Sequence, residues 1–439
     1  MKMTHRVPAD RLPTPMLMAF AVGSIGTGLF STVPTVLLLF YCTETLGIAA
    51  STASVILIVP KLWCLFWDPF VGRWSDRMQS RWGRRAPFLA AGAFGTAAAF
   101  VTLFHAPSGS KGVALYVGVA YFLATALYTL FSVPYIAVPA EISALPDERE
   151  RAIAWRMPCM MTGVLLGAAA APHLVAIGGG GAVGYAAMAW VIASVSLGGM
   201  LASAFAVRRL ASGTSPSVSQ AGPSPLRHAP FRRLLLAYMM QMCAVAYVFA
   251  AVPYLATQVL HAPPEAAGTL LGALLLSSIV AMPLWTVVAR RVGVARSLNI
   301  ATILLVVALA GLMMLRHGEL SGLAIVVFGA LGIPMAALQL LPFMMLAHVI
   351  NAYGRSNGSR REGAFTGLFI AAEKVALASG PALVGLGLTL LGHVGGGIKD
   401  ADDVGGGILL LAVAVPAALG LTSAAVGRLA PLAPREAAP

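Results

Sequence analysis

The stretch Lys61–Pro87, KLWCLFWDPFVGRWSDRMQSRWGRRAP, begins with an ammonium group inside an apolar segment and ends in a strongly basic turn. The apolar run from Ala50 to Trp74 is long enough to cross a bilayer as a helix, because about 20 residues rising about 1.5 Å each span the hydrocarbon core. Lys61 then lies near the middle of the membrane, where its charge must face protein or water. The stretch therefore predicts a membrane-spanning helix with one polar face.

The polar face of this helix has a regular spacing. Lys61, Cys64 or Leu65, Asp68 and Gly72 recur at i, i+3 or i+4, i+7 and i+11, which places them on one side of an α-helix. Two interpretations stay open: charges that serve a solute pathway, or a structural Lys–Asp pair that holds helices together.

The composition excludes a soluble globular protein. Of 439 residues, 59% are hydrophobic and only 10% are charged, which is typical of a polytopic membrane protein. The net charge of +13 does not indicate nucleic-acid binding, because the basic residues lie in short loops between apolar runs and no nucleic-acid motif accompanies them. We therefore expect a lipid bilayer as the surrounding medium and no nucleic acid as a partner.

Cysteines and phosphate-binding motifs give no sign of a cofactor. Cys42, Cys64, Cys159 and Cys243 lie in or beside apolar segments without a CxxC spacing, so neither a metal site nor a disulfide framework is expected. The sequence has no GxxxxGK[ST] motif, which argues against an ATP-driven pump. The first apolar run is too long for a secretory signal and is interpreted as a retained span.

Apolar runs separated by charged or Gly/Pro-rich breaks predict an all-α polytopic protein with twelve transmembrane helices. Their approximate limits are 15–41, 50–74, 87–106, 112–138, 154–177, 182–206, 234–259, 265–289, 296–315, 320–350, 364–391 and 405–429. With this assignment, 23 of the 29 Lys and Arg residues lie on the side of the N-terminus. Cytoplasmic loops carry the excess of positive charge, so both termini are predicted to be cytoplasmic.

A Ser-, Pro- and Gly-rich segment at 208–233 separates the sixth span from the seventh. It predicts an N-terminal six-helix half over 1–207, a cytoplasmic linker, and a C-terminal six-helix half over 234–439. The halves share a spacing of proline and arginine, a weak repeat of the kind found in duplicated transporters, at Pro69 with Arg77 and at Pro283 with Arg291.

Three stretches carry a resemblance to a known family: Asp68–Phe88, DPFVGRWSDRMQSRWGRRAPF; Val138–Arg156, with VPAEIS and DERERAIAWR; and Asn357–Gly367, NGSRREGAFTG. Together they resemble the glycoside-pentoside-hexuronide:cation symporters, the branch of the major facilitator superfamily that includes the melibiose carriers. The resemblance implies the major facilitator fold, two six-helix halves, and solute transport across the cytoplasmic membrane by alternating access.

The basic turns of these stretches are expected to form a cytoplasmic gate that holds one access state until ligand binding shifts the equilibrium. Exposed ion pairs contribute at most about 1 kcal/mol each, which suits contacts that must break. The alternative is a plain positive-inside anchor. The gate residues predicted are Asp76, Arg77, Arg84, Arg85, Arg149 and Arg361.

The resemblance also implies a substrate and ion cavity inside the membrane. Its basic residues and its Asp-Pro aspartate correspond to Lys61, Arg156, Lys374 and Asp68. The full set expected at the cavity is Lys61, Cys64, Asp68, Tyr128, Ser132, Arg156, Gln339, Glu373 and Lys374.

The carboxylates that sodium-coupled members place on three helices correspond here to Gly28, Cys64 and Ser132. A sodium ion needs several hard oxygen ligands with a carboxylate among them, so proton coupling is expected rather than sodium coupling. The remaining charges lean positive, which favours an anionic solute.

Two tryptophans that stack on sugar in the family correspond to Ile136 and Gln339. Their loss favours, as an alternative, a carrier of amphipathic anions such as lysophospholipids. Tyr121, Tyr128 and Tyr135 line the cavity in one interpretation and serve helix packing in the other.

Two histidines remain open between a functional and a structural role. His348 lies where the family commonly has Asp and would titrate near neutral pH; the other interpretation is an interfacial residue without a role in transport. His173, beside a proline in the fifth span, has the same two interpretations.

Glu373 and Lys374 are adjacent, so they diverge by about 100° around a helix and cannot share one direction. The family resemblance and the small-residue stripe Gly363, Gly367, Ala371, Lys374, Ala378 predict that Lys374 faces the cavity, with Asp68 or the substrate as its partner. The alternative is that this stripe is a seam for helix packing. Glu373 is then expected to bond to a neighbouring helix or to stay protonated.

A secondary transporter, expected as a monomer, is the leading interpretation. An embedded enzyme would need a reactive cluster near one membrane face, which the sequence lacks, and no enzymatic activity is expected. A non-transporting receptor on the same fold would have little use for Lys61, Arg156 and Lys374 inside the membrane. The sequence leaves the substrate and the direction of transport open.

Overall fold

The computed structural model describes residues 12–107, 109, 112–142, 146–210, 225–315, 322–357, 362–391 and 401–428. Within these ranges the chain forms helices joined by short turns, and no β-strand is present.

The first set of helices comprises α1 (Thr14–Val33), α2 (Ala50–Arg77), α3 (Ala86–Leu103), α4 (Val113–Ile142), α5 (Pro146–Leu165), α6 (Ala171–Ile177) and α7 (Gly181–Leu210). The second set comprises α8 (Ala229–Tyr254), α9 (Ala266–Val292), α10 (Val294–Leu312), α11 (Gly322–Asn357), α12 (Glu362–Leu390) and α13 (Ala401–Arg428). Five short π or 3-10 segments, η1 (Pro34–Leu38), η2 (Tyr41–Thr45), η3 (Leu166–Ala170), η4 (Pro225–Arg227) and η5 (Leu255–Val259), join or extend these helices.

Twelve helices in the described part of the chain are long and apolar enough to cross a membrane, as predicted. Their ends differ from the predicted limits by a few residues. The seventh span begins at Ala229 instead of residue 234, and α7 continues to Leu210, so both helices extend into the predicted linker. Hydropathy marks the apolar part of a helix, whereas the helix itself continues into the polar turn beyond it.

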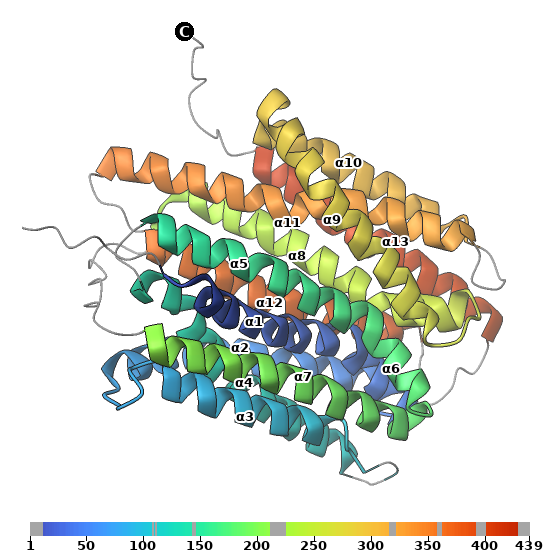
Figure 1. Ribbon diagram of the computed structural model, residues 1–439. Helices are drawn as coiled ribbons and strands as arrows, with labels where there is room; N and C mark the ends of the chain where they lie inside the picture. The colour runs from blue at the N-terminus through green and yellow to red at the C-terminus, as the bar shows by residue number, and fades with distance from the viewer. Residues whose placement is uncertain are drawn as a thin grey trace, which may run out of the picture.

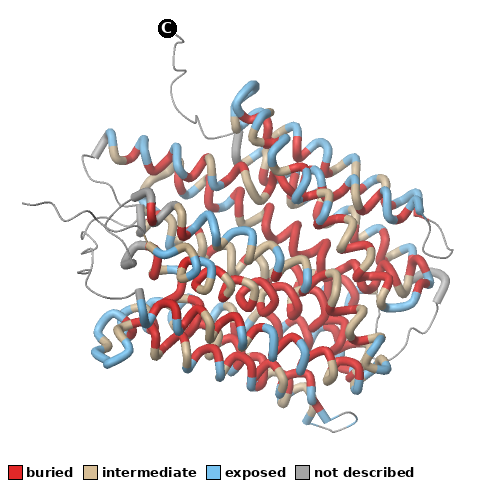
Figure 2. Tube along the Cα trace, viewed as in Figure 1, coloured by how far each residue is buried: buried red, intermediate tan, exposed pale blue. Residues whose placement is uncertain are grey.

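The outer surface of the bundle is apolar. Large hydrophobic side chains such as Phe66 and Val280 are 74% and 77% exposed, which is typical of residues that face lipid. Buried residues lie along the inner faces of the helices, as Figure 2 shows. The protein is therefore an integral, multi-pass membrane protein.

Helices of each set pack mainly against one another. In the first set α1 contacts α5 and α7, and α3 contacts α4 and α7; in the second set α8 contacts α12 and α13, and α9 contacts α11. Figure 1 shows α3, α4 and α7 along one edge of the bundle and α9, α10 and α11 along the other. The two sets meet through α2 with α12, η1 with α8, and η3 with α9.

Three of the π segments have a neighbouring proline. Pro34 begins η1, Pro172 follows η3 by two residues, and Pro253 precedes η5 by two residues. A proline has no amide hydrogen to donate, so the hydrogen-bond ladder of the helix is rearranged around it. Two of these segments, η1 and η3, lie where the two sets meet.

The spans alternate in direction, so every turn lies at one of two ends of the bundle. We call the end that holds Leu12 and the turn after α2 the terminal end. The opposite end, which holds the turn after α6, is the far end. At the far end, contacts join the two sets. The hydroxyls of Thr43 and Tyr254 are 2.7 Å apart, and a Cβ placed on Gly385 of α12 would lie 2.1 Å from Ser54 Oγ of α2. Backbones can approach this closely only where a glycine has no side chain.

At the terminal end, two ring contacts of the described residues each lie within a single set. The guanidinium of Arg208 stacks over the Trp82 ring at 5.1 Å within the first set, and the His228 and Tyr353 rings lie 5.3 Å apart within the second. A Cβ on Gly367 of α12 would meet nothing within 4 Å. Close contacts between the two sets are therefore seen at the far end, whereas α12 faces open space at Gly367, nearer the terminal end.

Candidate functional site

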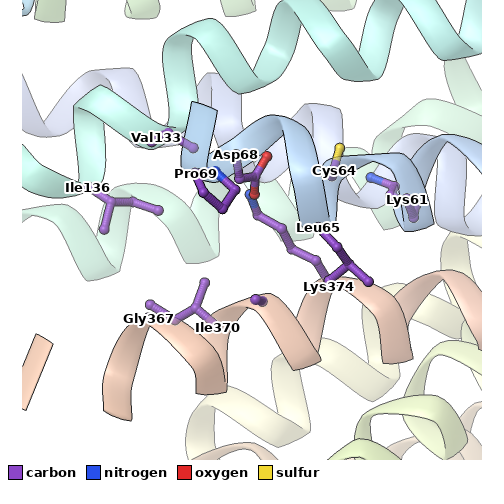
Figure 3. Close-up of a pocket in the computed structure, with 11 residues that line it drawn as sticks. Lys61, Cys64, Leu65, Asp68, Pro69, Val133, Ile136, Gly367, Ile370 and Lys374 are labelled. Carbon is purple, nitrogen blue, oxygen red and sulfur yellow. The ribbon is translucent and has the colours of Figure 1, made fainter. Parts of the chain in front are cut away.

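A cavity of about 300 Å³ lies between the two sets, where α2 and α4 face α12. Figure 3 shows its lining residues converging from these three helices. They are Lys61, Cys64, Leu65, Asp68, Pro69, Val133, Ile136, Gly367, Ile370, Ala371 and Lys374.

Helical periodicity accounts for this lining. On α2 the positions 61, 64, 65, 68 and 69 recur every three or four residues, and on α12 the positions 367, 370, 371 and 374 do the same. The sequence predicted both stripes, and the structure shows that they face the same space.

The Asp68 carboxylate and the Lys374 ammonium form an ion pair inside this cavity. Figure 3 shows the Lys374 side chain extending from α12 to the carboxylate on α2. Thr129 Oγ1 of α4 donates a hydrogen bond of 3.0 Å to the other carboxylate oxygen. Both oxygens of Asp68 are therefore engaged, and the ion pair joins the two sets of helices.

Lys61 is the second cation of the cavity. Its Nζ lies 5.9 Å from the centre of the Tyr121 ring, within range of a cation–π interaction. No carboxylate in the described ranges lies within ion-pairing distance of it. The Cys64 thiol, one turn further along α2, lies 3.7 Å from Thr129 Oγ1. With one carboxylate and two ammonium groups, the cavity carries an excess of positive charge.

Arg156 does not line this cavity. Its Nε donates to Ser24 Oγ at 3.2 Å, and its guanidinium stacks over the Tyr135 ring at 4.7 Å. The Tyr135 hydroxyl lies 2.8 Å from Ser24 Oγ and donates to the Phe20 carbonyl. Arg156 therefore connects α1, α4 and α5 within the first set, again without a carboxylate partner among the described residues.

Four further residues predicted at the site lie outside the cavity lining. Tyr128 stacks on Phe30, with ring centres 4.4 Å apart. Ser132 is buried in α4, and its hydroxyl has no hydrogen-bond partner in the described part of the chain. Gln339 is half-buried in α11, and Glu373 lies beside Tyr238 of α8. Ile136, the counterpart of a sugar-stacking tryptophan, does line the cavity.

Four of the predicted gate residues lie at the terminal end. Asp76 and Arg85 form an ion pair, and Arg85 also donates to Ser75 Oγ. This contact joins the end of α2 to the start of α3, so it lies within the first set and does not connect the two sets. Arg77 is exposed and Arg84 is half-buried.

Two gate residues cannot be placed. The side chain of Arg149 and the whole of Arg361 lie outside the described residues. The two histidines occupy different settings: His348 is exposed on α11, and His173 Nε2 lies 3.5 Å from Thr269 Oγ1 of α9, where the two sets meet.

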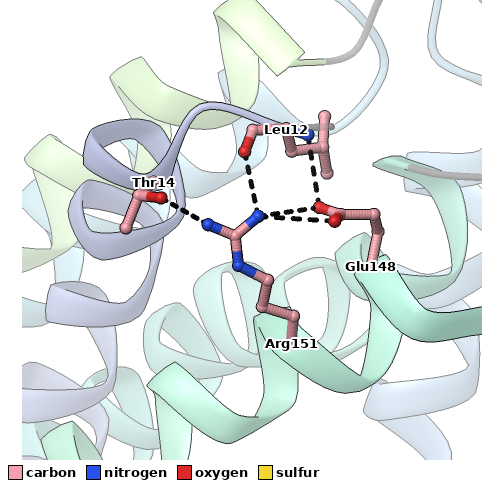
Figure 4. A network of polar contacts seen from close by, with 4 residues as sticks. All are labelled: Leu12, Thr14, Glu148 and Arg151. Atoms are coloured by element: carbon pink, nitrogen blue, oxygen red, sulfur yellow. Dashed lines mark hydrogen bonds and ion pairs between the residues drawn. The ribbon is translucent and has the colours of Figure 1, made fainter. Parts of the chain in front are cut away.

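A second polar network at the terminal end was not predicted. Arg151 donates to the Leu12 carbonyl and to both oxygens of Glu148, and it also contacts the Thr14 hydroxyl (Figure 4). The Leu12 amide donates to Glu148 at 3.2 Å. The network fixes the start of α1 on α5. The acidic DERER stretch was the available signal, but the sequence does not show which helix it would meet.

Thr129 was also missed. The available signal was a stripe of small hydroxyl residues along α4, and such a stripe is equally typical of helix packing. Its members are Thr125, Thr129 and Ser132. The contact of Thr129 with Asp68 depends on how α4 is placed against α2.

A helical bundle of two sets with a charged cavity between them defines a transporter of the major facilitator type. A solved structure with the same fold is a bacterial homologue of the iron transporter ferroportin in its inward-facing state; its TM-score is 0.65 at 14% identity, over 95% of this chain and 97% of that one.

A family model described as MFS/sugar transport protein matches residues 19–433. An uncharacterised symporter of Synechocystis is 23% identical over 89% of this chain and 88% of its own length. A glucuronide carrier protein homolog of Escherichia coli is 28% identical over 31% of this chain and 30% of its own length. The chain belongs to the MFS/sugar transport family, in its glycoside-pentoside-hexuronide:cation symporter branch, and the resemblance seen in the sequence is confirmed.

Proposed function

We propose that this protein is a secondary active transporter that moves a small organic anion, such as a hexuronide or another sugar-derived acid, together with a proton. The observation that carries the proposal is the cavity between the two sets of helices, in which Lys61 faces the space without a carboxylate partner in the described ranges.

The charges of the cavity support an anionic solute. Asp68 is engaged by Lys374 and Thr129, so the Lys61 ammonium stays available to a ligand. A carboxylate placed about 4 Å from an ammonium gains about 4 kcal/mol in an environment of intermediate dielectric, before desolvation is counted. A neutral sugar would leave this charge uncompensated.

The donor set supports proton coupling over sodium coupling. Position 64 offers a thiol, and Ser132 is buried outside the cavity lining. The two oxygens of Asp68 already accept hydrogen bonds. Hard cations require several oxygen ligands at once, and Gly28 contributes no side chain to such a set.

The arrangement of the two sets supports alternating access. Close contacts join them at the far end, and α12 faces open space at Gly367, nearer the terminal end. With the termini in the cytoplasm, as the positive charges favour, this is an inward-facing arrangement. The cytoplasmic gate would then form in the opposite state, which agrees with the Asp76–Arg85 pair lying within one set.

A second candidate is a carrier of amphipathic anions such as lysophospholipids. Leu65, Val133, Ile136 and Ile370 make much of the cavity lining apolar, and no aromatic ring that could stack on a sugar is among the described lining residues. A volume of about 300 Å³ is at the lower end for ligand pockets, so an acyl chain would have to extend beyond the cavity.

Uptake into proteoliposomes tests these proposals. The purified protein is given a labelled methyl glucuronide, the matching neutral methyl glucoside, or a lysophospholipid, each with an imposed proton or sodium gradient. Proton-driven uptake of the glucuronide and not of the glucoside supports the proposal. Uptake of the glucoside alone, or uptake driven only by sodium, contradicts it, and uptake of the lysophospholipid alone favours the second candidate.

A further inference from the structure

Helix α12 presents different residues to the two surfaces it contacts. Gly367, Ala371 and Lys374 line the cavity. Phe369 faces α8, where its ring stacks on Tyr238 with centres 4.0 Å apart, and Glu373 is one turn further along the same side. Consecutive residues therefore serve different surfaces, Lys374 the cavity and Glu373 the contact with α8.

Glu373 belongs to a polar cluster inside the second set. Its carboxyl lies beside the Tyr238 hydroxyl. Gln241, one turn along α8 from Tyr238, donates from Nε2 to Ser423 Oγ of α13 at 2.8 Å, and Ser423 in turn donates to the Ala237 carbonyl at 3.0 Å. The cluster thus connects α8, α12 and α13 away from the substrate cavity.

Two polar atoms of this cluster are left without partners. The Tyr238 hydroxyl and Gln241 Oε1 are buried and make no hydrogen bond of normal geometry within the described part of the chain. Both residues are only 1% exposed. Buried polar groups are nearly always satisfied in proteins, so an unpartnered hydroxyl beside a carboxyl, with a second unpartnered oxygen one turn along α8, indicates a place where a proton or a water molecule binds.

The charges around Glu373 do not compensate an ionised carboxylate. On α8 it faces Tyr238, which is neutral, and its sequence neighbour Lys374 is engaged by Asp68. On α2, Lys61 and Asp68 face the cavity instead. No described cation forms an ion pair with Glu373. Glu373 is half-buried in this contact. A partly desolvated carboxylate without a cation is costly, whereas the neutral acid offers an O–H donor that the Tyr238 hydroxyl can accept.

We infer that Glu373 is the proton-binding carboxyl of this carrier, with Tyr238 as the group that positions it. The inference rests on the proposed proton coupling and names the residue that performs it. The proton and the solute would then occupy different faces of one helix. Binding converts the carboxylate to the neutral acid, and release on the other side of the membrane restores it.

The adjacency of Glu373 and Lys374 provides the coupling. Loss of the proton creates a charge in the contact between α12 and α8, and hydration of that charge requires the contact to loosen. Lys374, the next residue, holds α12 to α2 through Asp68. A shift of α12 caused on one face therefore acts on the ion pair at the other face.

Infrared difference spectroscopy of the purified protein tests the site without any substrate. In the unsubstituted protein we expect the C=O band of a neutral carboxylic acid, which disappears at high pH. The band should be absent from Glu373→Gln, and in Tyr238→Phe it should disappear at a different pH. Glu265→Gln, at the start of α9, is the matched control and should keep the band. A band that persists in Glu373→Gln, or its absence from the unsubstituted protein, overturns the inference.

Transport of labelled methyl glucuronide separates this inference from the proposed function. A gradient of one pH unit sustains about a tenfold accumulation per proton. In Glu373→Gln we expect this accumulation to be lost, while solute exchange at equal pH falls much less. If the unsubstituted protein shows no proton-driven accumulation, the proposed function and the inference both fail. If it does and Glu373→Gln accumulates equally well, only the inference fails.

Discussion

Gly268 of α9 lies where the two sets of helices meet at the far end, and replacing it with alanine should shift the conformational equilibrium. An added Cβ would lie 2.3 Å from the Ala169 carbonyl oxygen of η3 and 2.9 Å from the His173 ring. Ordinary contacts begin at 3.4 Å, so the helices would have to separate by about 1.1 Å. A backbone carbonyl cannot rotate away as a flexible side chain can.

The size of the effect follows from this overlap. Overpacking a tight contact costs about 1 to 3 kcal/mol. Because the contact exists only while the far end is closed, the penalty falls on that state alone, and the ratio of closed to open molecules should fall by about 5- to 150-fold. The substitution should therefore favour molecules that are open at the far end.

Spin labels at Val183 on α7 and Leu390 on α12 can measure the change, since both side chains lie at the far end and are 72% and 86% exposed. In Gly268→Ala we expect the distance distribution between them to move to longer values. Gly272→Ala is the matched control, because its Cβ would lie at an ordinary 3.4 Å from Ala169 Cβ. An unchanged distribution in Gly268→Ala, at unchanged thermal stability, would refute the reasoning.

Three further predictions concern the cavity and the terminal end. Lys374→Ala should abolish uptake of an anionic solute while the protein still folds, because the half-buried Asp68 loses its partner. Normal uptake by this variant would contradict a role of the Asp68–Lys374 ion pair in transport. Sodium should not raise the melting temperature of the protein relative to potassium, and it should not do so in Cys64→Asp either, since a single added carboxylate does not complete a cation site. Sodium-specific stabilisation of the unsubstituted protein would overturn the prediction that sodium is not the coupling ion. Asp76→Asn should change the transport rate, and the accessibility of cysteines engineered at either membrane face, more than it changes substrate affinity. The free energy of unfolding should fall by about 1 kcal/mol or less, because Asp76 is 54% exposed at its contact with Arg85. Loss of substrate binding with unchanged cysteine accessibility would contradict a gate.

The sequence predicted the spans because their signal is local. An apolar run of sufficient length must form a helix in lipid, whatever it packs against. The family resemblance rested on local motifs in three loops and is likewise confirmed. The division of the chain at residues 208–233, the orientation of the termini and the functional roles of the site residues remain predictions.

Helical periodicity also predicted which residues share a face, but not what that face meets. Asp68 and Lys374 are 306 positions apart, and only the packing of α2 on α12 brings them together. The family resemblance placed Arg156 at the cavity, whereas the structure places it with Ser24 and Tyr135. An arginine side chain is long enough to reach several partners, so its position depends on which hydroxyl and ring lie nearby.

What the sequence determined by itself is therefore the membrane-spanning architecture and the separate directions of Glu373 and Lys374, because these depend on hydropathy and on the angle between successive residues of a helix. Only the tertiary structure decided that Thr129 supports Asp68, that Glu373 lies beside Tyr238, and that the far end is the closed one. These contacts depend on the distance between helix axes, which is set by small residues on two helices at once and cannot be read from either helix alone.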